Sequence, residues 1–153
     1  MTRSVTHDTF TLERTYPHSP ERVFNAWAKS DAKAAWFGDD EQLETRGSYS
    51  LDFRIGGRER FTAVMTDGTP VRYDAVYQDI VDAERIVLSY DMHLNDQRIS
   101  VSLMTVEFVG APGGTQMVLT EQDAFLDGLD TREQREEGTR ILFDKLGEFL
   151  DKS

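Results

Sequence analysis

The fold of this chain depends on its last long segment, residues 131–151, which read TREQREEGTRILFDKLGEFLD. Apolar side chains recur there at three- and four-residue spacing. They form one stripe, made of Leu142, Leu146, Phe149 and Leu150, with Ile141 and Phe143 beside it. Asp130 or Thr131 can cap the segment, because Glu133 or Gln134 follows at capping-box spacing. The pattern predicts an amphipathic helix about 31 Å long.

Ahead of this helix the sequence alternates between apolar and polar residues in short runs. The runs cover residues 9–16, 43–45, 49–55, 61–65, 71–77, 86–92, 99–109 and 117–123. Turn signals separate them, among them Asp67-Gly68 and the Pro-Gly-Gly of residues 112–114. Period-two alternation with short turns predicts an antiparallel meander.

Two short helices are expected after the first run. Residues 19–21 read Ser-Pro-Glu, a typical helix start, and apolar residues follow at helical spacing. A second helix is expected over 31–37, with Ser30 as its cap and Gly38 beyond its end.

A sheet with one apolar face must bury that face, and the C-terminal helix is large enough to cover it. We therefore predict an α+β helix-grip fold. A curved antiparallel sheet of six or seven strands surrounds the long C-terminal helix, and two short helices follow the first strand. No repeat or linker divides the sequence, so residues 1–153 are expected to form a single domain. A straight helix and a twisted sheet differ in shape, which leaves space for a cavity at one end.

The composition excludes several classes of function. Lysine and arginine total 17 against 28 aspartates and glutamates, a net charge of −11. Binding to nucleic acid or to an anionic membrane would need the opposite sign. The absence of cysteine removes disulfides and thiolate metal sites. Residues 1–8 are polar and no apolar run is long enough to span a bilayer, so we expect no signal peptide, no membrane insertion and a cytoplasmic location.

Several segments resemble one known superfamily. They are FTLER at 10–14, SPERVFNAW at 19–27, AWFG at 35–38, AERIVLSY at 83–90 and GTQMVLTE at 114–121. These segments are similar to the SRPBCC or START-like superfamily, and more narrowly to its branch named after the activator of the heat-shock protein 90 ATPase. The runs at 100–107 and 120–128 look typical of a bacterial subgroup. The resemblance covers nearly the whole chain.

The resemblance implies a helix-grip fold with a cavity under the last helix. Superfamily members bind lipids, sterols, polyketides or plant hormones there, and a few use the cavity for cyclisation or hydrolysis. We therefore expect this chain to bind a small, largely hydrophobic molecule such as a lipid, a polyketide or an aromatic metabolite. One alternative is a cavity enzyme of the cyclase or hydrolase type, so enzymatic activity is left open. The second is a stress-related protein-interaction or co-chaperone-like domain, although the branch name alone does not imply chaperone activation.

Large side chains are the first candidates for the cavity wall. They are Trp27, Trp36, Phe37, Tyr73, Tyr77, Tyr90 and Met92. The first three adjoin the short helices, where they serve either as core packing or as a lid over the entrance. The tyrosines share alternate positions of neighbouring strands, so their hydroxyls either orient a ligand or bond within the core. The methionine would add an adaptable wall or plain core packing.

Two charged residues are expected on the same face of their strands as apolar neighbours, because they alternate with them in the sequence. Arg14 alternates with Phe10 and Leu12, and Glu121 alternates with Met117. Because an inward arginine needs a carboxylate partner, an Arg14–Glu121 pair is one hypothesis. It would be either a structural ion pair or a polar hook for the carboxylate or carbonyl of a ligand.

The stripe of the C-terminal helix extends backward from Leu142 through Thr139 and Gly138 to Arg135. Glycine inside a helix costs about 1 kcal/mol relative to alanine. Close packing on the sheet and room for a ligand are the two compensations that we consider. Three acidic residues also gather before this helix, Glu121, Asp123 and Asp127, and they act either as acid and base or as a solvated strand end and loop.

No metal or cofactor is predicted. His7, His18 and His93 show no metal-ligand spacing, and the sequence contains no glycine-rich phosphate-binding motif. His93 is at most a residue of a cavity mouth. A homodimer formed through a sheet edge is left open.

Overall fold

The computed structural model describes residues 2–38 and 43–153. Strand β1 is followed by two short helices, six further strands and a long helix. The elements are β1 (Val5–Tyr16), α1 (Pro20–Ala28), α2 (Ser30–Trp36), β2 (Leu43–Leu51), β3 (Arg58–Met65), β4 (Pro70–Val81), β5 (Arg85–Leu94), β6 (Gln97–Ala111), β7 (Gly114–Leu126) and α3 (Arg132–Lys152). This order confirms the predicted α+β helix-grip architecture.

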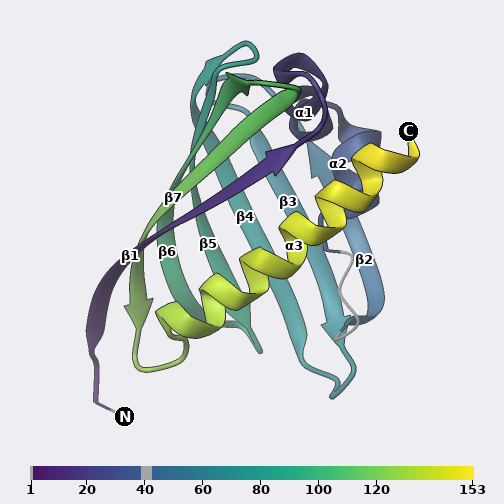
Figure 1. Ribbon diagram of the computed structural model, residues 1–153. Coiled ribbons are helices and arrows are strands. Elements are labelled where there is room, and N and C mark those ends of the chain that lie inside the picture. Colours follow the sequence, from purple (N-terminus) through teal and green to yellow (C-terminus); the bar gives the residue numbers. More distant parts are fainter. Residues whose placement is uncertain (1, 39–42) are drawn as a thin grey trace.

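The strands form one antiparallel sheet in the order β1-β7-β6-β5-β4-β3-β2. Strands β2 to β7 pair in chain order, whereas β1 pairs with β7, which places Phe10 opposite Glu121 and Arg14 opposite Met117. Helix α3 lies diagonally across one face of this curved sheet, and α1 and α2 lie beside its C-terminal half (Figure 1). The backbone of α3 comes closest to β1, α2 and α1. Helix α3 therefore contacts the middle strands mainly through its side chains.

Two of the three predicted helix caps are present, and the predicted Ser30 cap is not. The Ser19 side chain accepts a hydrogen bond from the backbone N–H of Arg22, and the Thr131 side chain accepts one from Gln134. Helix α2 differs from the prediction, because it begins at Ser30 itself. Only one residue separates it from α1, and the extended backbone of that residue redirects the chain without a side-chain cap.

Strand β2 ends earlier than its sequence pattern suggests. The alternation runs to Ile55, but the strand stops at Leu51, which pairs with Glu59 of β3. Phe53 lies in the connecting loop and packs edge-on against the rings of Phe24 and Tyr77. Because Phe53 packs against the core from the loop, the loop needs an apolar residue there, and this residue continues the alternating pattern of the strand.

The face that α3 buries is rotated from the predicted stripe. Its buried residues are Arg135, Thr139, Phe143, Leu146 and Leu150, whereas Leu142 and Phe149 are partly buried. None of the helices in residues 2–38 and 43–153 is long and apolar enough to cross a membrane.

Gly147 of α3 packs closely against Tyr16 of β1. A Cβ atom at Gly147 would lie 3.3 Å from Cε1 of Tyr16, whose hydroxyl donates to the carbonyl of Phe143 at 2.9 Å. A Cβ atom at Gly138 would meet no atom within 4 Å outside its own helical neighbourhood. Close packing therefore does not explain Gly138.

We expect Gly138→Ala to stabilise the protein by about 0.5–1 kcal/mol, because alanine favours the helix and meets no obstacle. Gly147→Ala should lose stability, because the Tyr16 ring is fixed by burial and by its hydrogen bond. Urea unfolding followed by circular dichroism measures both changes. Equal gains at the two positions would show that Tyr16 does not limit the approach of α3.

Candidate functional site

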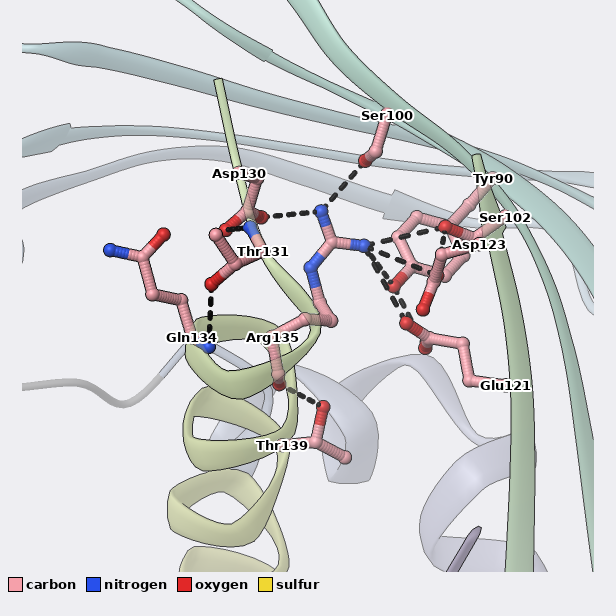
Figure 2. Close-up of polar contacts among 10 residues, drawn as sticks. All are labelled: Tyr90, Ser100, Ser102, Glu121, Asp123, Asp130, Thr131, Gln134, Arg135 and Thr139. Carbon is pink, nitrogen blue, oxygen red and sulfur yellow. Dashed lines mark hydrogen bonds and ion pairs between the residues drawn. The ribbon is translucent and has the colours of Figure 1, made fainter. Parts of the chain in front are cut away.

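The first turn of α3 places Arg135 against the inner face of the sheet, where it is 8% exposed. Its Nη1 donates to the Tyr90 hydroxyl at 2.9 Å and to Ser102 Oγ at 3.3 Å. Its Nη2 donates to Ser100 Oγ at 2.7 Å and to Asp130 Oδ2 at 2.9 Å. These groups come from β5, from β6 and from the loop before α3, and Figure 2 shows them converging on the guanidinium. Each terminal nitrogen of the guanidinium therefore already has two acceptors.

Two buried carboxyl groups of β7 complete this arrangement. Glu121 Oε1 accepts a hydrogen bond from Tyr90 at 2.8 Å, and Asp123 Oδ1 accepts one from Ser102 at 2.5 Å. Arg135 Nη1 lies 3.5 Å from Glu121 Oε2 and 3.7 Å from Asp123 Oδ1. Both Glu121 Oε2 and Asp123 Oδ2 are buried and accept no hydrogen bond from the described residues. We call the set Tyr90, Ser100, Ser102, Glu121, Asp123, Asp130 and Arg135 the Arg135 cluster.

Burial raises the pKa of the Glu121 carboxyl well above its ordinary value, and the neighbouring Asp123 carboxyl raises it further. The positive charge of Arg135 lowers this pKa, but that charge is shared with Asp123 and Asp130. Glu121 therefore keeps its proton at pH values where an exposed glutamate is ionised. Burial would lower the pKa of the Arg135 guanidinium, but Tyr90 and the surrounding carboxylates outweigh it and raise that pKa.

A second buried ionic group lies between α2 and β3. Lys33 Nζ is 2.7 Å from Glu59 Oε2, and both side chains are fully buried. Glu59 also accepts hydrogen bonds from three tyrosine hydroxyls, those of Tyr49 at 2.6 Å, Tyr77 at 2.9 Å and Tyr73 at 3.3 Å. Burial and the Glu59 charge raise the pKa of each of these hydroxyls, so they remain protonated donors.

The three aromatic candidates near the short helices surround Lys33. Its Nζ lies 4.5 Å from the ring centre of Phe37, 5.0 Å from that of Trp27 and 5.7 Å from that of Trp36. A cation over aromatic faces is attracted by their quadrupoles. Both tryptophans are buried in the core, whereas Phe37 is partly buried.

The three inward tyrosines are divided between the two polar groups. Tyr73 and Tyr77 donate to Glu59, whereas Tyr90 donates to Glu121. Met92 is partly buried on β5, directly opposite Tyr73 of β4. Tyr90 is thus the tyrosine that joins the Arg135 cluster.

The hypothesised Arg14–Glu121 pair is not present. Arg14 instead donates to Asp144 and to the carbonyl of Arg140, both on α3. The pairing of β1 with β7 places Arg14 opposite Met117, four residues from Glu121. Parity placed both side chains on the inner face, but parity does not determine register.

The remaining α3 candidates, Gly138, Thr139 and Leu142, follow Arg135 along the helix. The Thr139 hydroxyl donates to the carbonyl of Arg135 at 2.8 Å. Asp144 faces β1 through its contact with Arg14, and helical geometry puts Gly138 and Leu142 on the opposite flank. This flank is only partly buried at both positions.

Sequence reasoning missed several members of these groups. Lys33 was absent from the candidates, although Glu59 shares strand parity with the buried Phe61, a signal that was available. Asp123 is 3% exposed, so the solvated role considered for it is wrong. Ser100 and Ser102 carry no chemical signature in the sequence.

Two surface hollows lie elsewhere. One of about 300 Å³ includes Arg72 and His93, at the side of the sheet formed by β2 to β5. One of about 650 Å³ lies between the start of α1, the β4–β5 turn and β6. No residue of α3 lines either hollow.

The described residues bring together one group of metal-binding residue types, Asp74, Asp91 and His93. Arg60 and Arg72 donate to the two carboxylate oxygens of Asp74 at 2.7 and 3.0 Å. Because two arginines already bind the carboxylate oxygens of Asp74, a divalent cation would find these ligands occupied and positive charge beside them. We therefore place no metal at this group.

The family model for activator of Hsp90 ATPase homolog 1-like proteins matches residues 17–151. The chain belongs to this family. The resemblance to the SRPBCC superfamily is thereby confirmed, and the fold is one that this superfamily uses in general for binding ligands. Among proteins with a curated function, none matches the chain.

Solved structures of bacterial proteins are similar over nearly the whole length. An uncharacterized protein from Rhizobium leguminosarum has 44% identity and a TM-score of 0.95, with both chains covered completely. The Mll3558 protein from Rhizobium loti has 46% identity and a TM-score of 0.87, over 95% of this chain and 99% of that one. An AHSA1-like protein from Aeromonas hydrophila, at 18% identity and a TM-score of 0.70 over 95% and 93% of the two chains, shares the fold.

Replacing Lys33 alone should destabilise the protein strongly. In Lys33→Met, Glu59 is left as an uncompensated buried charge, which costs about 3–5 kcal/mol in the free energy of unfolding. The double variant Lys33→Met/Glu59→Gln should recover most of this loss, because no unpaired charge remains. Urea unfolding measures both, with the exposed Lys29→Met as control. A double variant no more stable than the single one would contradict the ion-pair account.

Glu121→Gln should change how stability depends on pH. Since the folded protein raises the pKa of Glu121, the stability from its protonated form is fully present below about pH 4.5 and is lost as pH rises through the folded pKa. Glutamine stays neutral, so the variant should gain stability over the parent increasingly between pH 5 and pH 8. Thermal unfolding across this range measures the gain, with the exposed Glu13→Gln as control. Parallel curves for Glu121→Gln and the parent would show that Glu121 is already ionised.

Proposed function

We propose that the protein binds a small, largely apolar molecule between α3 and the middle strands of the sheet, with the polar end of the molecule at the Arg135 cluster. The observation that carries this proposal is the burial of Arg135 with Glu121 and Asp123 in the core. A buried ionic group contributes little net stability, because desolvation offsets the attraction, and apolar side chains of similar size serve the fold as well. Perturbed buried groups of this kind gather at functional sites.

The apolar part of the site is proposed on the flank of α3 that faces away from β1. The backbone of α3 stays closest to β1 and the short helices, and Gly138 leaves open space on the other side. Leu142 and Met92 are partly buried apolar residues packed on the core. A lipid, a polyketide or an aromatic metabolite fits a site with an apolar wall and a polar end.

One observation favours a cavity enzyme as the second candidate. Glu121 holds its proton beside the carboxyl group of Asp123, so one group can act as an acid while the other acts as a base. Cyclisation and hydrolysis both use such a pair. We propose a cytoplasmic location for either function, in keeping with a chain that contains no cysteine.

Gly138→Leu should block uptake of the molecule and leave the fold intact, because the added side chain occupies the open flank. The matched control is Glu137→Leu, which adds the same side chain at an exposed position of α3. Native mass spectrometry of each protein purified from its own host, followed by lipid extraction, measures the bound molecule. We expect adducts on the parent and the control, and a loss of at least tenfold on Gly138→Leu.

Two results would overturn the proposal. One is a parent protein that carries nothing and takes up no apolar molecule. The other is a Gly138→Leu variant that carries as much as the control while showing the same thermal midpoint as its parent.

A further inference from the structure

The hydrogen-bonding groups of the Arg135 cluster are used unequally. The terminal guanidinium nitrogens each have two acceptors, and the hydroxyls of Tyr90 and Ser102 each donate to a carboxyl oxygen. Within the described residues, Oε2 of Glu121 and Oδ2 of Asp123 accept no hydrogen bond from any other side chain, and the single proton that Glu121 shares with Asp123 is the one donor between them. The cluster therefore has acceptors left over, whereas its strong donors are engaged.

We propose that the cluster selects, among apolar molecules, those that end in a hydrogen-bond donor, a primary ammonium in preference to a hydroxyl, and that it excludes carboxylates. This inference rests on the proposed function, because it names the chemical class that the same site accepts. It differs from the sequence-based hypothesis, in which an inward arginine would hold a ligand carboxylate.

The charges in the cluster favour the ammonium. Asp123 and Asp130 are two carboxylates around the single cation of Arg135, at 3.7 and 2.9 Å. The cluster is therefore anionic even while Glu121 is protonated, and a second cation would balance it. A carboxylate would lie against Asp123, and the Glu121 proton, the donor nearest to it, already serves Asp123, so its burial would place like charges together without a donor of their own.

The positions of Glu121 and Asp123 also favour a head group that donates hydrogen bonds over one that carries only a positive charge. Glu121 and Asp123 occupy alternate positions of β7 on the inner face, so the N–H groups of one head could reach both. Charge-assisted hydrogen bonds contribute about 1.5–3 kcal/mol each, which corresponds to roughly tenfold or more in affinity. A quaternary ammonium has the same charge but no N–H group, so it forfeits this gain.

The test compares four probes with the same eight-carbon chain: octylammonium, octyltrimethylammonium, 1-octanol and octanoate. Isothermal titration calorimetry at pH 7 in 0.15 M salt, which screens the net charge of −11, gives affinity and stoichiometry. We expect one site that binds octylammonium at least tenfold more tightly than octyltrimethylammonium, 1-octanol next, and octanoate most weakly. Glu121→Gln, which removes the carboxyl group, and Asp123→Asn, which removes a negative charge, should each reduce the preference for octylammonium. Glu13→Gln, the same replacement of glutamate by glutamine at an exposed position, should leave the preference unchanged.

The outcomes distinguish the preference for a hydrogen-bond donor from the proposed binding of apolar molecules. If none of the probes binds, both fall. If octanoate binds as tightly as octylammonium, the donor preference falls while binding of apolar molecules stands. If octyltrimethylammonium equals octylammonium, net charge rather than hydrogen-bond donation selects the molecule, and the inference is again overturned. The comparison of probes on the parent protein decides the matter even if the variants fail to fold.

Discussion

The contact between Arg135 and the inner face of the sheet sets the position of α3. A single guanidinium joins the first turn of the helix to hydroxyls on β5 and β6 and to Asp130 in the preceding loop. Arginine suits this role because its donors are fixed in one plane and reach several acceptors at once. This contact determines which side of the first turn of α3 faces the strands, whereas the Thr131 cap marks where the helix begins.

The rest of α3 is held by contacts of a different kind. Tyr16 bonds to the carbonyl of Phe143 and fits against Gly147, and Arg22 of α1 donates to the carbonyl of Leu150 at 2.6 Å. These contacts fix the middle and the end of the helix against β1 and α1. The flank at Gly138 lies outside these contacts, and an added Cβ atom there would meet nothing within 4 Å.

Much of the fold could be predicted from the sequence, because it depends on local patterns. Period-two alternation gave the strands, and the caps at Ser19 and Thr131 gave the two helix starts. The failures concern relations between distant segments. Arg14 was paired with Glu121 because side-chain parity is visible in one strand, whereas register depends on both. Lys33 was missed because a charged residue on a short helix is expected at the surface until its buried partner, Glu59 of β3, is known.

The pairing of the first strand with the last has a consequence for how the chain assembles. Among the described strands, β1 (residues 5–16) pairs with residues 115–126 of β7 alone (Figure 1). On the ribosome, the nascent β1 must wait while most of the polypeptide is translated, and the meander from β2 to β7 can form before it. Such long-range contacts slow folding, so docking of the N-terminal segment is expected to be a late step of biogenesis.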